Sequence, residues 1–189
     1  MDITQLILDD HHEQRRLFAM IEEIDRTDTA ALAALWTRLS ALLDVHAEAE
    51  ELFFYPEVLK LGTGAGGADS AAGETKDAIH DQNEIRDTAA DVARHDVGSR
   101  DWFNAVDKAN KANSEHMGEE EREGLTDFRR HASLELRHDL AYGSPRTMRV
   151  ISRGRPGRQG SSEVHRLEPV GSTRRSRATW QFVPEPDRQ

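Results

Sequence analysis

Two histidine–glutamate pairs in the sequence have residue types and a spacing suited to metal binding. His46 precedes Glu50 by four residues, and His116 precedes Glu120 by the same interval. Side chains four residues apart lie on one face of an α-helix, so each pair can direct an imidazole and a carboxylate to one place. Imidazole and carboxylate groups on facing helices of a bundle are the ligands from which two-metal carboxylate centres are built.

Both pairs lie in apolar stripes that have the helical period, which indicates that they point into a protein core. Burying an imidazole and a carboxylate costs several kcal/mol unless the groups are paired or coordinate a metal. From the residues alone, two readings stay open: His–Glu hydrogen bonds in a metal-free core, and a metal site. The stripe residues around the two pairs are Leu32, Leu35, Trp36, Leu39, Leu42, Leu43, Phe53 and Phe54, and Trp102, Ala105, Val106, Ala109, Asn113 and Met117.

Four amphipathic helices joined by short links are expected to position these residues. The first begins after Asp2 as N-cap and places His11 on the edge of its apolar face, with His12 on the opposite side. The second ends near Pro56 to Gly62, the third covers about 75–93, and the fourth begins at Asp101 as cap and continues to about Leu140. The pattern predicts an all-α, antiparallel up-down four-helix bundle over residues 1–142.

The composition narrows the chemistry of the site. The chain has no cysteine, so a metal has to be held by histidine and carboxylate, which favours iron or manganese over structural zinc. No apolar run approaches the roughly 18 residues of a membrane span, and the acidic start lacks the basic region of a signal peptide. We therefore expect a cytoplasmic protein that makes no membrane contact.

The charge is distributed unevenly along the chain. Residues 143–189 contain 10 Arg and no Lys against 4 acidic residues, whereas residues 1–142 contain 15 basic and 31 acidic residues. The acidic body argues against a nucleic-acid-binding face. We expect the tail to be a disordered, non-homologous extension that could contact an acidic partner.

The motifs together resemble the hemerythrin-like, or HHE cation-binding, family. The matching segments are Asp10-His11 with Leu17-Phe18, His46-Ala-Glu-Ala-Glu50-Glu51 leading to Tyr55-Pro56, and His116-Met-Gly-Glu-Glu120-Glu121, within about residues 1–130. The resemblance implies a non-haem di-iron centre that binds or reacts with dioxygen, peroxide or nitric oxide. It also implies the metal ligands His11, His46, Glu50, His116 and Glu120.

The third helix departs from the family pattern. Similar members place a ligand histidine directly before a segment like Asn83-Glu84-Ile85-Arg86, and that position here is Gln82. His80 lies about 200° away around the helix, so it cannot replace Gln82 without a local distortion. Because an amide oxygen binds iron more weakly than imidazole, the di-iron centre is expected to be incomplete or open there. Tyr55 is expected to project away from the ligand stripe and to pack at the helix end.

Three functions compete at this stage. The first is a di-iron protein that handles or senses a small oxygen species, as an oxidoreductase if it turns over. The second is an iron-binding module without turnover, which Gln82 favours. The third is a structural or regulatory bundle that has lost its metal. The sequence leaves the oligomeric state open.

Overall fold

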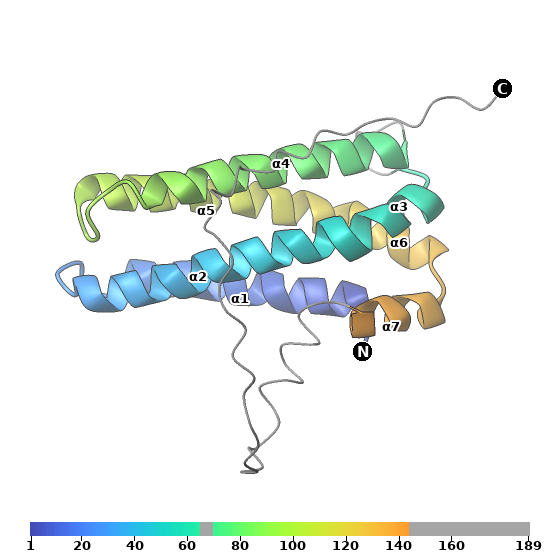
Figure 1. Ribbon diagram of the computed structural model, residues 1–189, viewed down its shortest axis with the longest axis horizontal. Helices are drawn as coiled ribbons and strands as arrows, with labels where there is room; N and C mark the ends of the chain where they lie inside the picture. The colour runs from blue at the N-terminus through green and yellow to red at the C-terminus, as the bar shows by residue number, and fades with distance from the viewer. Residues whose placement is uncertain (65–69, 144–189) are drawn as a thin grey trace, which may run out of the picture.

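The fold is a bundle of antiparallel helices, as the sequence predicts. The computed structural model describes residues 1–64 and 70–143, and no strand occurs among them (Figure 1). A π-helical turn, η1 (Glu50–Phe54), joins α2 to α3. The helices are α1 (Ile3–Glu23), α2 (Thr29–Ala49), α3 (Tyr55–Leu61), α4 (Ala71–Val92), α5 (Arg100–Arg122), α6 (Gly124–His131) and α7 (Leu134–Gly143).

Four rods make up the bundle: α1, α2 continued by α3, α4, and α5 continued by α6 (Figure 1). The predicted all-α four-helix bundle is therefore confirmed. The fourth rod is not one helix to Leu140, because it breaks at Glu123 and again at Ala132 before α7. The disorder expected for the tail concerns residues 143–189. Of these residues, only Gly143 lies in the described part of the chain.

Side-chain caps fix where the rods begin. Asp2 accepts a hydrogen bond from the backbone N–H of Thr4, as predicted, and Asp28 caps α2. The third rod begins at Ala71, earlier than expected, where the Ser70 hydroxyl accepts from the N–H of Gly73. The cap of α5 is Ser99 and not Asp101, which lies inside the first turn. A hydroxyl or carboxylate at these positions satisfies an N–H that the helix leaves unpaired.

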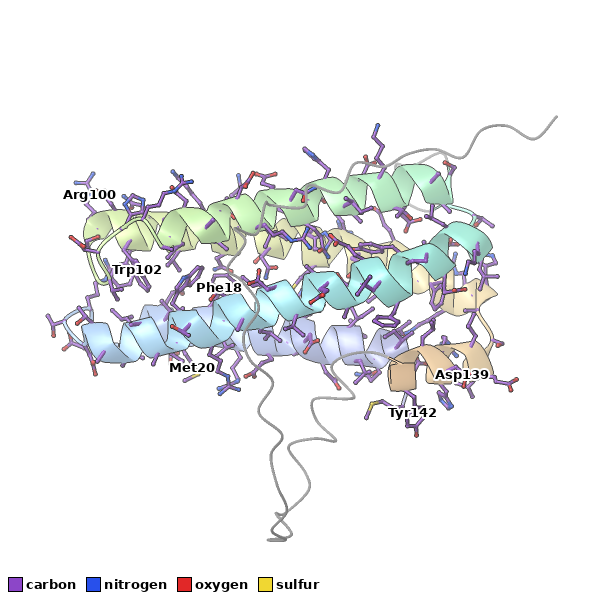
Figure 2. All side chains as sticks on the ribbon, in the orientation of Figure 1. Phe18, Met20, Arg100, Trp102, Asp139 and Tyr142 are labelled. Atoms are coloured by element: carbon purple, nitrogen blue, oxygen red, sulfur yellow. The ribbon has the colours of Figure 1, made fainter. Side chains whose placement is uncertain are left out.

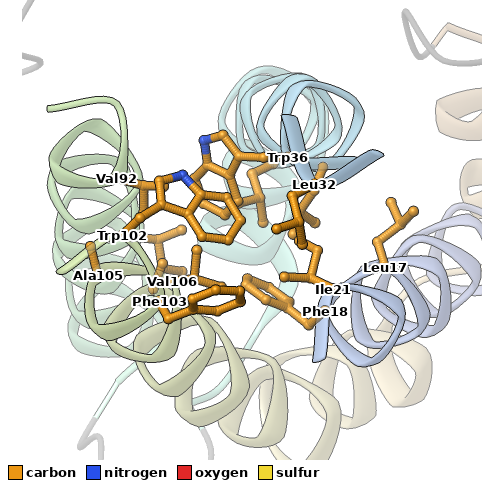
Figure 3. Close-up of a cluster of buried hydrophobic side chains, with 14 residues drawn as sticks. Leu17, Phe18, Ile21, Leu32, Trp36, Val92, Trp102, Phe103, Ala105 and Val106 are labelled. Atoms are coloured by element: carbon orange, nitrogen blue, oxygen red, sulfur yellow. The ribbon is translucent and has the colours of Figure 1, made fainter. Parts of the chain in front are cut away.

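Two hydrophobic clusters fill the bundle, one towards each end. The tryptophan cluster lies near the α1–α2 and α4–α5 links, and in it Trp36 and Trp102 meet edge to face with ring centroids 6.3 Å apart (Figure 3). The Phe54 cluster lies where α3, α6 and α7 meet the start of α1. In it, the ring centroids of Phe54 and Phe128 are 5.1 Å apart. In Figure 2, Phe18 and Trp102 point between the rods, whereas Arg100 points outwards.

A layer of buried polar side chains separates the two clusters. In α1, for example, Asp10, His11 and Gln14 lie between Ile7 of the Phe54 cluster and Leu17 of the tryptophan cluster. Helices α2, α4 and α5 contribute polar residues at matching heights, since their apolar stripes are interrupted at His46, Gln82 and His116. The whole polar layer is Asp10, His11, Gln14, His46, Glu50, Gln82, Asn113, His116 and Glu120.

In residues 1–64 and 70–143, no helix is both long enough and apolar enough to cross a bilayer. The cytoplasmic location stays a prediction.

Candidate metal centre

Four of the predicted ligands form a compact group inside the polar layer. One ligand atom from each of His11, His46, Glu50 and Glu120 lies within 4.8 Å of the others, and all four residues are buried. We call this group the tight cluster. It draws on α1, α2, the π turn and α5, so three rods must pack together to assemble it. Two imidazoles and two carboxylates at this separation could hold a metal ion.

The two histidines of the tight cluster use their ring nitrogens in the same way. His11 turns Nδ1 towards Glu121 Oε1 at 2.9 Å and Nε2 towards Glu120 Oε2 at 3.4 Å. His46 turns Nδ1 towards Asp10 Oδ2 at 3.5 Å and Nε2 towards Glu50 Oε1 at 2.9 Å. A carboxylate behind Nδ1 fixes the ring and leaves Nε2 for a metal, which is the usual support of a ligating histidine.

His116 follows the same rule but is held less firmly. Its Nδ1 lies 3.8 Å from Asp81 Oδ2, and its Nε2 has no hydrogen-bond partner among the described residues. Although His116 is buried in the same layer, it does not belong to the tight cluster. The structure thus places all five predicted ligands in one layer and draws four of them tightly together.

Gln82 occupies the inner face of α4, as the sequence predicts, whereas His80 is exposed. The Gln82 side chain is 2% exposed, and its Nε2 donates hydrogen bonds to Glu50 Oε2 and, at 3.1 Å, to the hydroxyl oxygen of Tyr55. Its Oε1 has no partner in the described part of the chain. Gln82 therefore stands beside the tight cluster, and His80 cannot reach it without a rotation of α4. We call Tyr55, Gln82 and His116 the open side.

The prediction that Tyr55 projects away from the ligand stripe is wrong, whereas its predicted packing at the helix end is confirmed, since Tyr55 lies in the Phe54 cluster. Tyr55 is 4% exposed, and its side chain points towards the site, where the hydroxyl donates a hydrogen bond to Glu50 Oε2 at 3.4 Å. The cause is the π turn, in which the N–H of Tyr55 bonds to the carbonyl of Glu50 five residues earlier. The extra residue in this turn brings Tyr55 back to the face of Glu50, whereas regular α-helical geometry would rotate it away.

One signal in the sequence could have indicated this turn. Pro56 has no N–H, so it cannot donate to the carbonyl of Leu52, and its ring crowds that carbonyl in a regular α-helix. A proline less than two turns after a predicted ligand, here Glu50, is thus a reason to test a π turn, which often occurs at functional sites.

The comparison with protein families agrees with this geometry. Residues 2–126 match the Hemerythrin HHE cation binding domain. The chain belongs to this family. The matched segment contains the tight cluster and the open side, whereas most of α6 and all of α7 lie beyond it. Neither the curated proteins nor the solved structures gave a match.

The buried charges of this hemerythrin-family protein pair within the tight cluster. Burial lowers the pKa of His46, but the charge of Glu50 and the contacts with Asp10 and Glu50 outweigh burial and raise that pKa to about 10. Burial likewise raises the pKa of Glu50, but the charge and hydrogen bond of His46, with the charges of His116 and His11, lower it to about 2. Without a metal, the pair therefore holds a proton on His46 at neutral pH. A metal has to displace that proton, because only neutral imidazole coordinates.

The residues present fit a cation. Two buried carboxylates face three imidazoles, and the contact of Glu120 Oε2 with His11 Nε2, at 3.4 Å, is long for a hydrogen bond. His116 Nε2 is buried without a partner in the described residues, which is costly for a polar atom. A divalent ion between these atoms would satisfy them and balance the two glutamates. The geometry does not identify the metal.

Proposed function

We propose that this hemerythrin-family protein holds non-haem iron in its polar layer and uses it to bind or react with dioxygen, peroxide or nitric oxide. The observation that carries the proposal is the shared orientation of three buried histidines. Each turns Nδ1 to a carboxylate, from Glu121, Asp10 or Asp81, and two of them turn Nε2 to a glutamate of the tight cluster. A metal-free core does not require such an arrangement in three separate helices.

Iron fits the ligand set better than zinc or magnesium. Mixed imidazole and carboxylate ligands without thiolate suit iron, and structural zinc is typically held by cysteine and histidine. The tight cluster would hold one ion. The open side would hold a second, with His116 as its imidazole ligand. Glu50 contacts both the tight cluster and the open side. Its Oε1 contacts His46, and its Oε2 accepts hydrogen bonds from Gln82 and Tyr55. Its carboxylate is therefore shared by the two proposed metal positions.

Bound iron would supply the redox chemistry, and the surrounding residues would control it. Glu121 and Asp10 hold the imidazoles of His11 and His46 in the orientation that ligation needs. The Tyr55 hydroxyl can donate a hydrogen bond beside the open side, and burial with the charges of Glu120 and Glu50 raises its pKa well above the usual value. The phenol therefore stays protonated at neutral pH. The two hydrophobic clusters cover the layer towards the two ends of the bundle.

The test is the iron-to-protein ratio after anaerobic loading with Fe²⁺, followed by the visible spectrum on exposure to air and by a peroxide-consumption assay. We expect nearly two irons per chain, an oxo-to-iron absorption band and catalytic loss of peroxide. Gln82→His should tighten the second iron, whereas the control Asn83→His adds its imidazole on an exposed position of α4 and should change nothing. A folded protein that binds no iron would contradict the proposal.

A second candidate is an iron-binding module without turnover, and Gln82 is the observation that favours it. Its amide already bonds to Glu50 and Tyr55, which leaves the second metal position with one imidazole, that of His116. This candidate predicts one iron per chain, a second iron only in Gln82→His, and no catalytic consumption of peroxide by the parent protein.

A further inference from the structure

A cavity of about 300 Å³ lies between α3, α4 and the α5–α6 junction and reaches the polar layer. Its inner wall includes Tyr55, His116 and Glu120, which belong to the candidate metal centre. Its outer wall includes the exposed side chains of Asp77 and Glu119. The cavity therefore connects the surface with the open side and, through Glu120, with the edge of the tight cluster.

The walls of this cavity are strongly acidic. Six of the residues that line the cavity carry a carboxylate. Among the described lining residues, none is Lys or Arg. Three carboxylates follow one another along α4 at positions that share a face, and three lie on the last turn of α5 and at its junction with α6. From the exposed to the buried end, the set runs from Asp77 and Glu119, through Glu74, Asp81 and Glu123, to Glu120.

Two buried polar atoms face this cavity without a hydrogen-bond partner in the described residues. The Thr75 hydroxyl belongs to a residue that is 3% exposed, and His116 Nε2 belongs to another that is 3% exposed. Leaving such groups unsatisfied in a protein interior is costly. Their presence on the wall of a cavity indicates that a polar ligand or its water reaches them.

We propose that this cavity is the route by which a divalent metal cation reaches the buried centre, with Asp77, Glu119 and Glu123 as transient ligands. The proposal rests on the function proposed above, since it assumes that the centre takes a metal. A cleft lined by charges of one sign concentrates the oppositely charged ion and raises its association rate by about 10- to 1,000-fold. Carboxylate oxygens also suit the partly hydrated state of an arriving ion.

The size of the cavity agrees with this role. A water molecule requires at least about 10–15 Å³ of cavity volume, so the space admits an ion together with six waters of hydration. As the ion moves inwards, the ladder of carboxylates replaces water by protein oxygen, and His116 and Glu120 then receive it. The same charges repel anions, so a neutral molecule such as peroxide or dioxygen can share the route and an anionic one cannot.

The test measures the rate at which metal-free protein takes up Fe²⁺, and separately Co²⁺, by anaerobic stopped-flow absorbance at low ionic strength. The variant Asp77→Asn, Glu119→Gln, Glu123→Gln removes three charges from the cavity. The control Glu84→Gln, Asp87→Asn, Asp107→Asn removes three charges from exposed positions that do not line it. We expect the cavity variant to bind about tenfold more slowly with an unchanged final metal ratio, and the control to stay within about twofold of the parent.

Ala78→Phe provides a test that leaves every charge in place. Ala78 lines the cavity, so a phenyl ring there should narrow it and slow uptake as well. Equal uptake rates in the parent, both triple variants and Ala78→Phe would overturn the route. So would a lower final metal ratio with an unchanged rate, because the carboxylates would then be permanent ligands. A parent protein that binds no metal at all would instead refute the proposed function.

Discussion

The tight cluster and the open side are neighbours in one buried layer, yet their side chains are held very differently. In the tight cluster, His11 is fixed by a 2.9 Å contact to Glu121, which Arg15 also holds at 2.8 Å. On the open side, His116 has its supporting carboxylate 3.8 Å away, and a cavity reaches it from the surface. The comparison indicates that one part of the layer is built for affinity and the other for access.

The difference has two local origins. Helix α4 supplies an amide, Gln82, where the other rods supply imidazole, so this side offers weaker ligands. The π turn brings in Tyr55, whose hydroxyl fills part of the remaining space. Strong and weak positions therefore meet at Glu50, which contacts both.

The largest effect should come from removing the residue that both sides share. Glu50→Gln takes away a charge that would stabilise a bound cation and a carboxylate that contacts both the tight cluster and the open side. We expect metal affinity to fall by more than about 100-fold, beyond the 10- to 100-fold typical of supporting residues. Metal titration by calorimetry checks this result. Glu48→Gln is the control, because Glu48 is exposed in the same rod, and equal losses in both variants would contradict the role of Glu50.

The support of His11 should rank next. Glu121→Gln replaces the carboxylate behind Nδ1, so the imidazole loses its fixed orientation and part of its basicity. The affinity of the tight cluster should fall by about 10- to 100-fold, with the fold retained. Glu115→Gln, an exposed change in the same helix, should have no effect. Unchanged metal affinity in Glu121→Gln would show that the Nδ1 contact does not support ligation.

A pH series on metal-free protein tests the ion pair within the tight cluster. The pKa of His46 is about 10 in the folded protein against an ordinary 6.5, so its contribution to stability is complete below about pH 6.5 and is lost as the pH rises through 10. The pKa of Glu50 is about 2 against 4.5, so its contribution is complete above about pH 4.5 and is lost as the pH falls through 2.

Urea unfolding of the metal-free protein should therefore show a lower midpoint at pH 9.5 than at pH 6. In His46→Gln this alkaline decrease should shrink, because the titrating imidazole is gone. Metal affinity should show the opposite trend and increase with pH, since binding releases the proton of His46. A decrease of equal size in His46→Gln would assign the alkaline loss to other groups.

The smallest effect is expected on the open side. Tyr55→Phe removes one hydroxyl that donates to Glu50 and accepts from Gln82, at a cost of about 1 kcal/mol in the free energy of unfolding. The tight cluster should keep its metal affinity within about twofold, because the contacts among its four ligands are untouched. Chemical denaturation and metal titration measure the two quantities. A large loss of affinity would mean that the two sides are not separable.

The sequence predicts those parts of this molecule that depend on period. The four rods, the inward positions of His46, His116 and Gln82, and the outward position of His80 all follow from where apolar residues recur. Contacts between rods do not follow from one helix alone. Glu121 supports His11 across 110 residues of chain, and only the packing of α1 against α5 shows it.

Two other features do not follow from the sequence pattern, because they depend on local geometry. The break at Glu123 interrupts a pattern whose period continues on both sides of it, so periodicity alone could not place it. A constant rotation of about 100° per residue places Tyr55 away from the site. The π turn does not have this rotation, so the sequence alone does not predict the contact of Tyr55 with Glu50.

The π turn also acts as a phase shift between the two halves of the second rod. Before it, Leu39, Leu43 and His46 face the interior, and after it Tyr55 and Val58 do so, although no single helical repeat connects the two sets. If the present residues formed a regular α-helix through Glu50–Phe54, everything after it would be turned by about 100°. Tyr55 would leave the site, and the Phe54 cluster would lose its contribution from α3. The π turn therefore keeps the polar layer and the far end of the bundle in register with each other.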